Sequence, residues 1–185
     1  MRRLALLVSV VGVVMALLAP TASAATPYCG ITWGSLPKAV PDEFSPGPVS
    51  DARAGRHTCF DRLVIDIANN TEPTGYTVSY VGQFIQDGSG QAIPLRGAAD
   101  LQITVSAPAY DGGGDSTVGW SAGDDAVNVA GFSTFRQVVF GGSYEGYTQF
   151  GLGVRARLPF RVSRLVSPPG QDASTRLVID VAHRW

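Results

Sequence analysis

One short strand is written almost identically twice in this chain. Residues 62–68 read RLVIDIA and residues 176–182 read RLVIDVA. The likeness extends further, because Val-Ser opens one segment at 49 and another at 162, and the RLVID sequence follows 13 and 14 residues later. Each segment has the pattern of a strand, a turn and a strand. Two copies are too few for a solenoid, so the repeat predicts a duplicated β-hairpin inside one domain.

Alternation within the repeated strand separates two faces, because successive side chains of a strand point to opposite sides. The apolar face is formed by Leu63, Ile65, Ile67, Leu177, Ile179 and Val181. The opposite face is formed by Arg62, Val64, Asp66, Arg176, Val178 and Asp180. The first face is expected in the core. The second face is open to two interpretations: cross-strand ion pairs, each worth about 0.2–1 kcal/mol, or a recognition surface.

The composition favours an all-β fold. Twenty-two Gly and 12 Pro punctuate the chain, and no stretch carries a 3.6-residue apolar period over three turns. We expect a β-sandwich in which the duplicated β-hairpin carries the RLVID strands. The expected strands are 49–56, 62–69, 75–83, 101–107, 132–140, 147–156, 158–166 and 175–182. Residues 108–128 are expected to form a loop, because their Gly and Asp residues follow no period.

The N-terminus predicts export. Arg2 and Arg3 precede an apolar run over 4–18, and Ala-Ser-Ala at 22–24 supplies the small residues of a cleavage site. We expect a signal peptide over 1–24 rather than an uncleaved anchor, because a membrane span needs roughly 20 apolar residues. No transmembrane segment is expected after cleavage. Five prolines between 27 and 48 indicate an irregular arm over 25–48, followed by a single domain over 49–185.

Charge and cysteine content narrow the function further. Loss of the signal peptide leaves 12 basic and 15 acidic residues, a balance that gives no indication of a nucleic-acid partner. In an exported chain, the cysteines at 29 and 59 are best interpreted as one disulfide, Cys29–Cys59. Two cysteines and two histidines in this spacing do not form a zinc-ligand set. We therefore expect no metal and no cofactor.

A group of arginines forms a second candidate binding feature. Arg155, Arg157 and Arg161 all have odd numbers, so they are expected on one face of the strands predicted over 147–156 and 158–166. Aligned guanidinium groups can hold carboxylates or phosphates through two hydrogen bonds at once. The alternative is a solvated face, since most surface charges contact only water.

Two weak patterns point to catalysis. GWSAG at 119–123 matches G-x-S-x-G, and Ser121 would be followed by Asp180 and His183 in the order of a hydrolase triad. A nucleophile elbow needs a strand before it and a helix after it, whereas a triple-Gly loop precedes this motif. Asp66, Asp180 and Glu145 could serve as glycosidase carboxylates, but arginine neighbours favour the ionised form over a general acid. An envelope hydrolase is therefore the less favoured alternative.

Several motifs give the chain a resemblance to a known family. They are the two cysteines with 29 residues between them, GRHTCFDRLVIDI, GYTVSYV, DGSG, YEGYTQFGLG, LPFRV and RLVIDVAH. Together they resemble the AMIN-like domain of exported actinobacterial proteins over about 49–184. The chain is more distantly similar to AMIN domains, which direct cell-wall amidases to the division site by binding peptidoglycan. The shared motif is R-[LI]-V-x-D.

The resemblance implies a β-sandwich of two related halves, each with one RLVID strand, so that the two strands are not neighbours. The alternative is antiparallel pairing with Val64 opposite Val178, which would set Arg62 against Asp180. The resemblance also implies a secreted, non-catalytic module of the cell envelope that binds a wall glycan or an envelope protein. A protein–protein interaction module remains a further alternative. The candidate ligand-binding residues are Arg62, Asp66, Arg176, Asp180, Arg155, Arg157 and Arg161.

Overall fold

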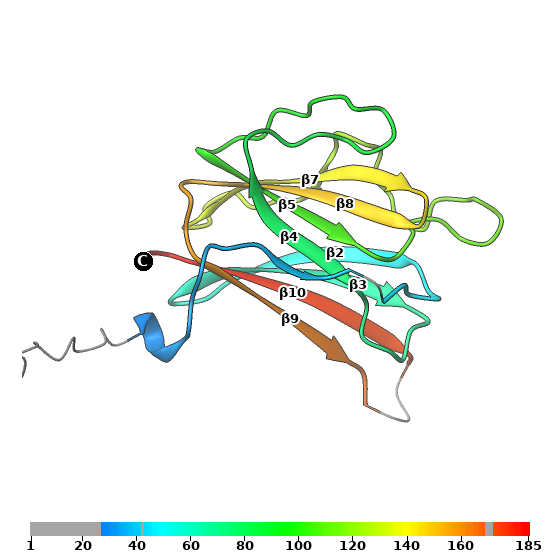
Figure 1. Ribbon diagram of the computed structural model, residues 1–185, viewed down its shortest axis with the longest axis horizontal. Helices are drawn as coiled ribbons and strands as arrows, with labels where there is room; N and C mark the ends of the chain where they lie inside the picture. The colour runs from blue at the N-terminus through cyan, green and yellow to red at the C-terminus, as the bar shows by residue number, and fades with distance from the viewer. Residues whose placement is uncertain (1–26, 42, 169–171) are drawn as a thin grey trace, which may run out of the picture.

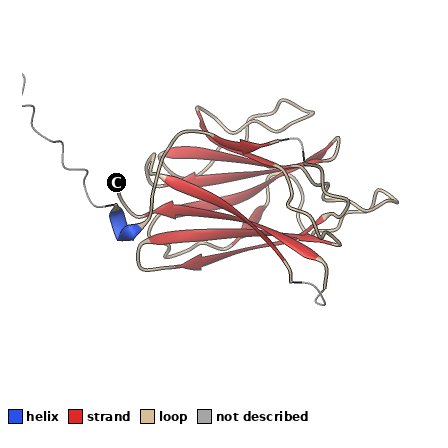
Figure 2. Ribbon diagram, turned by 60° about the horizontal axis from the view of Figure 1, so that its bottom comes forward, coloured by secondary structure: helices blue, strands red, loops and turns tan. Residues whose placement is uncertain are grey.

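The computed structural model describes residues 27–41, 43–168 and 172–185. The signal peptide predicted over 1–24 lies outside these residues. Within them, ten strands form two antiparallel sheets. Figure 1 and Figure 2 show the two sheets packed face to face. The predicted all-β sandwich is thereby confirmed. No helix among the described residues is long and apolar enough to cross a bilayer.

The four-stranded sheet consists of the two repeated hairpins. Its order is β2-β3-β10-β9. The first repeat forms β2 (Val49–Arg56) and β3 (Phe60–Ala68), and the second forms β9 (Phe160–Val166) and β10 (Ser174–Ala182). Each hairpin contributes one central strand and one edge strand, so the sheet has an approximate twofold relation between its halves.

The two RLVID strands are direct neighbours, so the prediction that they lie apart was wrong. β3 and β10 pair antiparallel, with Val64 opposite Val178 and Arg62 opposite Asp180. This register places the basic residue of each copy across from the acidic residue of the other. Opposite charges in such cross-strand positions are favourable, so the strand is complementary to an inverted copy of itself. The two copies therefore build one sheet instead of marking two halves of the sandwich.

The six-stranded sheet has the order β1-β4-β5-β8-β7-β6. Its strands are β1 (Lys38–Val40), β4 (Tyr76–Val81), β5 (Ala99–Val105), β6 (Asp125–Val127), β7 (Phe135–Tyr144) and β8 (Tyr147–Val154). The sequence did not predict the two edge strands. β1 lies in the proline-rich arm and β6 in the segment expected to be a loop. Three residues are too few to show an alternation of apolar and polar side chains.

The core lies between the two sheets. The six aliphatic side chains on the inward face of the RLVID strands are at most 1% exposed. They are Leu63, Ile65, Ile67, Leu177, Ile179 and Val181. They pack in one cluster with the inward side chains of the other sheet, among them Ile103, Phe150 and Leu152. Burial of each such side chain is worth roughly 1.5–3 kcal/mol. The apolar face predicted from the repeat is therefore the face that the four-stranded sheet gives to the core.

The segment between β4 and β5 lies across the outer face of the six-stranded sheet (Figure 1, green). Its Phe84 is fully buried. Two glycines of β8 make this close approach possible: a Cβ on Gly153 would lie 2.0 Å from the Arg96 carbonyl oxygen, and one on Gly151 would lie 2.7 Å from the Phe84 ring. Only a residue without a side chain fits at such positions.

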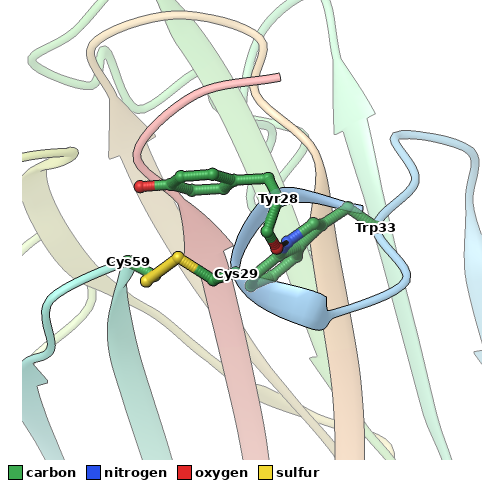
Figure 3. The surroundings of a disulfide bond; sticks show 4 residues. All are labelled: Tyr28, Cys29, Trp33 and Cys59. Atoms are coloured by element: carbon green, nitrogen blue, oxygen red, sulfur yellow. Dashed lines mark hydrogen bonds between the residues drawn. A yellow bond between two sulfur atoms is a disulfide. The ribbon is translucent and has the colours of Figure 1, made fainter. Parts of the chain in front are cut away.

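The predicted disulfide is present. Cys29, in the 3₁₀ turn η2 (Tyr28–Gly30), is bonded to Cys59 just before β3, with a Cα–Cα distance of 6.4 Å. Figure 3 shows Trp33 beside it, where the indole Nε1 donates a hydrogen bond of 2.9 Å to the Tyr28 carbonyl. The disulfide fastens the beginning of the described chain to the four-stranded sheet.

Candidate functional site

The outer face of the four-stranded sheet carries most of the predicted site. We use the name "arginine face" for the surface formed by Arg53, Arg62, Asp66, Arg161, Arg176 and Asp180. Antiparallel pairing brings these residues together from all four strands. Val64 and Val178 lie opposite each other between these charged residues, and Val178 is only 4% exposed. Apolar stems of long charged side chains commonly cover such positions.

Asp180 is the anchor of one half of the arginine face. Its carboxylate is almost fully buried and accepts hydrogen bonds from Arg62 Nε at 2.6 Å, Arg62 Nη2 at 2.9 Å and Arg161 Nε at 2.7 Å. Asp180 lies directly opposite both arginines in the sheet, which explains the short contacts. The hydrogen bonds that Arg62 donates to Asp180 raise the pKa of Arg62 above its usual range. Two guanidinium groups therefore share one carboxylate, and the cluster carries a net positive charge.

Aromatic rings support these arginines. The guanidinium carbons of Arg62 and Arg161 lie 5.2 Å and 5.3 Å from the ring centroid of Phe60. Arg161 also lies 5.6 Å from the ring centroid of Trp33, which the disulfide-bonded arm supplies. Cation–π contacts of this kind hold a guanidinium group in place. Through Trp33, the arm therefore helps to hold the Arg161 side chain in position.

The other half is not equivalent. Asp66 forms an ion pair with Arg53 of β2, although Arg176 lies opposite it on β10. The β2 position opposite Asp66 is Asp51, whereas the corresponding β9 position opposite Asp180 is Arg161. Of the two reciprocal Arg–Asp pairs that antiparallel pairing allows, only Arg62–Asp180 is formed among the described residues.

Arg176 is consequently distinct from the other arginines of this face. Its side chain is half-buried, it forms no ion pair with a described residue, and its Nε is buried without a hydrogen-bond partner there. Leu165, which is 46% exposed, lies opposite it on β9. A buried N–H group of a permanently charged guanidinium group usually has an acceptor. Arg176 therefore has donor capacity that a bound carboxylate or phosphate could use.

The predicted stripe of three arginines does not exist on one strand face, so that expectation was wrong. β8 ends at Val154 and β9 begins at Phe160, which leaves Arg155 and Arg157 in the connection. Arg155 donates to the His183 carbonyl, and the Arg157 guanidinium carbon lies 4.8 Å from the centroid of the Tyr80 ring. Only Arg161 lies on β9. Odd residue numbers indicate a shared face only within one continuous strand, and here the chain leaves the sheet between β8 and β9.

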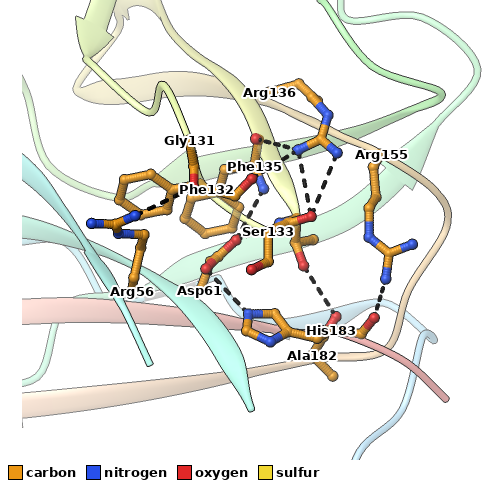
Figure 4. Close-up of polar contacts among 11 residues, drawn as sticks. Arg56, Asp61, Gly131, Phe132, Ser133, Phe135, Arg136, Arg155, Ala182 and His183 are labelled. Carbon is orange, nitrogen blue, oxygen red and sulfur yellow. Dashed lines mark hydrogen bonds and ion pairs between the residues drawn. The ribbon is translucent and has the colours of Figure 1, made fainter. Parts of the chain in front are cut away.

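A buried polar network at one end of the sandwich was missed by the sequence analysis (Figure 4). The fully buried carboxylate of Asp61 accepts backbone hydrogen bonds from Thr134 at 2.5 Å and Phe135 at 3.2 Å. Its second oxygen lies 3.2 Å from His183 Nε2. Asp61 and Leu63 are two residues apart on one strand and therefore face the same side. This alternation could have identified Asp61 as an acidic side chain that faces the core. The network joins the two sheets and is structural in character.

The catalytic patterns are not assembled. Ser121 is exposed in a loop, where its backbone N–H donates to Asp124. The His183 ring contacts Asp61, and Asp180 is held by two arginines, so neither completes a triad with Ser121. Glu145 lies in the turn between β7 and β8, away from the strands that carry the two aspartates of the repeats. Among the described residues, no three His, Cys, Asp or Glu side chains form a cluster that could hold a metal ion.

Comparison with known proteins gives one result. The model of the AMIN-like domain family matches residues 47–183. No curated protein and no solved structure matches the chain. The matched region includes both repeated hairpins, the core of both sheets and the whole arginine face. It confirms the resemblance that the sequence motifs indicated. The chain therefore belongs to the AMIN-like domain family.

Proposed function

We propose that this protein is a secreted, non-catalytic module of the cell envelope that binds peptidoglycan or another acidic wall polymer through its arginine face. Membership of the AMIN-like family supports a role related to the envelope. The Cys29–Cys59 disulfide supports an extracytoplasmic location, because disulfides persist in oxidising compartments.

The observation that carries the choice of surface is Arg176, which forms no ion pair with a described residue, although the buried Oδ2 of Asp66 opposite it also lacks a hydrogen-bond partner there. Arg62 and Arg161 share one carboxylate, and Arg176 has a buried Nε without a partner among the described residues. Peptidoglycan presents carboxylates on its stem peptides, and other wall polymers present phosphates. The planar guanidinium group matches two oxygens of either group. Arg176 is therefore the proposed primary contact, with Arg62, Asp66, Arg161 and Asp180 as its surroundings.

The proposed contacts are weak and sensitive to salt, because exposed charges are screened over about 8 Å at physiological ionic strength. The proposed binding surface leaves out Arg155, which donates to the His183 carbonyl, and Arg157, which lies over the Tyr80 ring. Arg62 is a poor residue for testing binding, since its loss would weaken the support of the buried Asp180. Arg176 allows a cleaner test, since no ion pair within the described chain depends on it.

The test is co-sedimentation of the mature protein with purified cell wall at low and high salt. We expect the wild type to sediment at low salt and to be released at high salt. Arg176→Ala should weaken binding about tenfold or more, because a charge-assisted contact is worth roughly 1.5–3 kcal/mol. Arg136→Ala is the matched control. It removes an equal charge from an exposed side chain of β7, whose hydrogen bonds to described residues go to nearby backbone carbonyls.

Two outcomes would count against the proposal. Wild-type protein that stays in the supernatant at low salt would show that the module does not bind wall. Equal sedimentation of Arg176→Ala and Arg136→Ala would show that binding, if present, uses another surface.

A further inference from the structure

A hollow of about 380 Å³ lies on the opposite side of the sandwich from the arginine face. One wall is the turn over 86–89, part of the segment that crosses the outer face of the six-stranded sheet. The other wall is the β7–β8 hairpin, with Tyr144 and Tyr147. The hollow shares no residue with the arginine face. Its volume is in the range of pockets that hold one small ligand.

Gln149 of β8 is the feature that gives the hollow a chemical preference. The side chain is 2% exposed, and its Oε1 accepts a hydrogen bond of 2.8 Å from the Asp87 N–H. This contact fixes the orientation of the amide, since only the oxygen can accept. The Nε2 group is therefore a donor, and it is buried without a partner among the described residues. Buried amide donors are nearly always satisfied in native proteins, so Gln149 offers a donor to an acceptor outside the chain.

The walls of the hollow favour a flat, neutral ring. The Tyr144 side chain is 51% exposed and its ring passes close to Gly88, where a Cβ would lie 3.1 Å from a ring carbon. Gly88 and Gly142 have φ values of 76° and 103°, which a residue with a side chain rarely adopts. The lining contains no Lys or Arg, and its one charged residue is Asp87. An anionic ligand is therefore disfavoured at this site.

We infer that this hollow is a binding subsite for an acetamido sugar, with the sugar ring on Tyr144 and the acetamido carbonyl accepting from Gln149 Nε2. A sugar ring has an apolar face that packs on an aromatic ring, and its hydroxyl groups suit the polar turn over 86–89. The acetamido carbonyl is a stronger acceptor than the hydroxyl groups of a plain sugar, and it extends beyond the ring. Because Nε2 is buried, the turn over 86–89 must move outward for the carbonyl to reach it, and this movement breaks the hydrogen bond from the Asp87 N–H to Gln149 Oε1.

The inference is tested by titration of the mature protein with N,N′-diacetylchitobiose up to about 20 mM, a range suited to millimolar affinity. Binding is followed through the NMR signals of the Gln149 side-chain amide. Cellobiose is the matched ligand control, because it has hydroxyl groups in place of the acetamido groups. We expect chitobiose to shift the Gln149 signal and cellobiose to bind at least fivefold more weakly. Loss of one hydrogen bond corresponds to roughly a tenfold change in Kd.

Variants separate the contacts. Gln149→Glu keeps the acceptor for the Asp87 N–H but removes the donor, so chitobiose binding should fall about tenfold. Gln91→Glu makes the same chemical change in the exposed segment outside the hollow and should leave binding unchanged. Tyr144→Ala changes a side chain that is half exposed, so the fold is preserved, and it should also weaken binding. Thermal unfolding of each variant checks its fold.

The inference is overturned if chitobiose causes no shift, if cellobiose binds equally well, or if Gln149→Glu binds like the wild type. These outcomes are independent of the wall sedimentation test, since Arg176 lies on the other sheet. Failure of the titration would leave the proposed function standing, and failure of sedimentation would leave the sugar subsite standing.

Discussion

At the scale of single residues, Asp61 is the most consequential buried charge. It is fully buried, accepts backbone hydrogen bonds from Phe135 at the start of β7 and from Thr134 just before it, and contacts His183. Each buried N–H group left without an acceptor costs about 1–3 kcal/mol. Asp61 therefore stabilises the contact between the two sheets.

We expect Asp61→Ala to lower the free energy of unfolding by about 3 kcal/mol, because two buried N–H groups lose their acceptor. Urea denaturation measures this through the midpoint. Asp51→Ala, at an exposed position on β2, should change stability by less than about 0.5 kcal/mol. Equal midpoints for the two variants would mean that water replaces the carboxylate at no cost.

The sequence predicts the residues of the arginine face better than their contacts. Alternation correctly placed Arg62, Arg176 and both aspartates on the face away from the core. It could not show that Asp180 is buried between two arginines, because Arg161 comes from a strand whose register is set by the tertiary fold. Nor could alternation show that Asp66 pairs with Arg53 and that Arg176 forms no ion pair with any residue the structure describes.

At the scale of elements, every predicted strand of six or more residues is present, and the errors concern short strands and pairing. Alternation over many residues determines which face is buried but does not identify the neighbouring strand. The charges of the RLVID strands favour the pairing of β3 with β10, because Arg62 lies opposite Asp180. Charge complementarity of exposed pairs is worth too little to decide a topology by itself.

The crossing of the segment after β4 over β8 depends on glycine. We expect Gly153→Ala to lower the free energy of unfolding by about 1–3 kcal/mol, because the new Cβ would displace the Arg96 carbonyl. Gly119→Ala is the control, since no atom lies within 4 Å of its added Cβ. Thermal unfolding of both variants gives the comparison, and a Gly153→Ala protein as stable as Gly119→Ala would show that this segment moves aside freely.

At the scale of the whole molecule, the disulfide ties the arm to the sandwich across 30 residues. The chain-entropy model makes a closed loop of this length worth about 3–4 kcal/mol. We expect the double variant Cys29→Ser/Cys59→Ser to be less stable by up to that amount, measured by urea denaturation. Reductant should destabilise the wild type similarly and should have no effect on the double variant. A reductant effect on both proteins would contradict this assignment.

The pairing of β3 with β10 has the symmetry of an isologous dimer interface, although both strands belong to one chain. Residue 62 lies opposite residue 180, and residue 66 lies opposite residue 176. A true homodimer of hairpins would have to change both copies of a residue together. Here a single gene encodes two independent copies, so each copy is free to diverge. The two copies have diverged in their contacts: Asp180 is buried between two arginines, whereas the Nε of Arg176 is buried with no hydrogen-bond partner among the described residues.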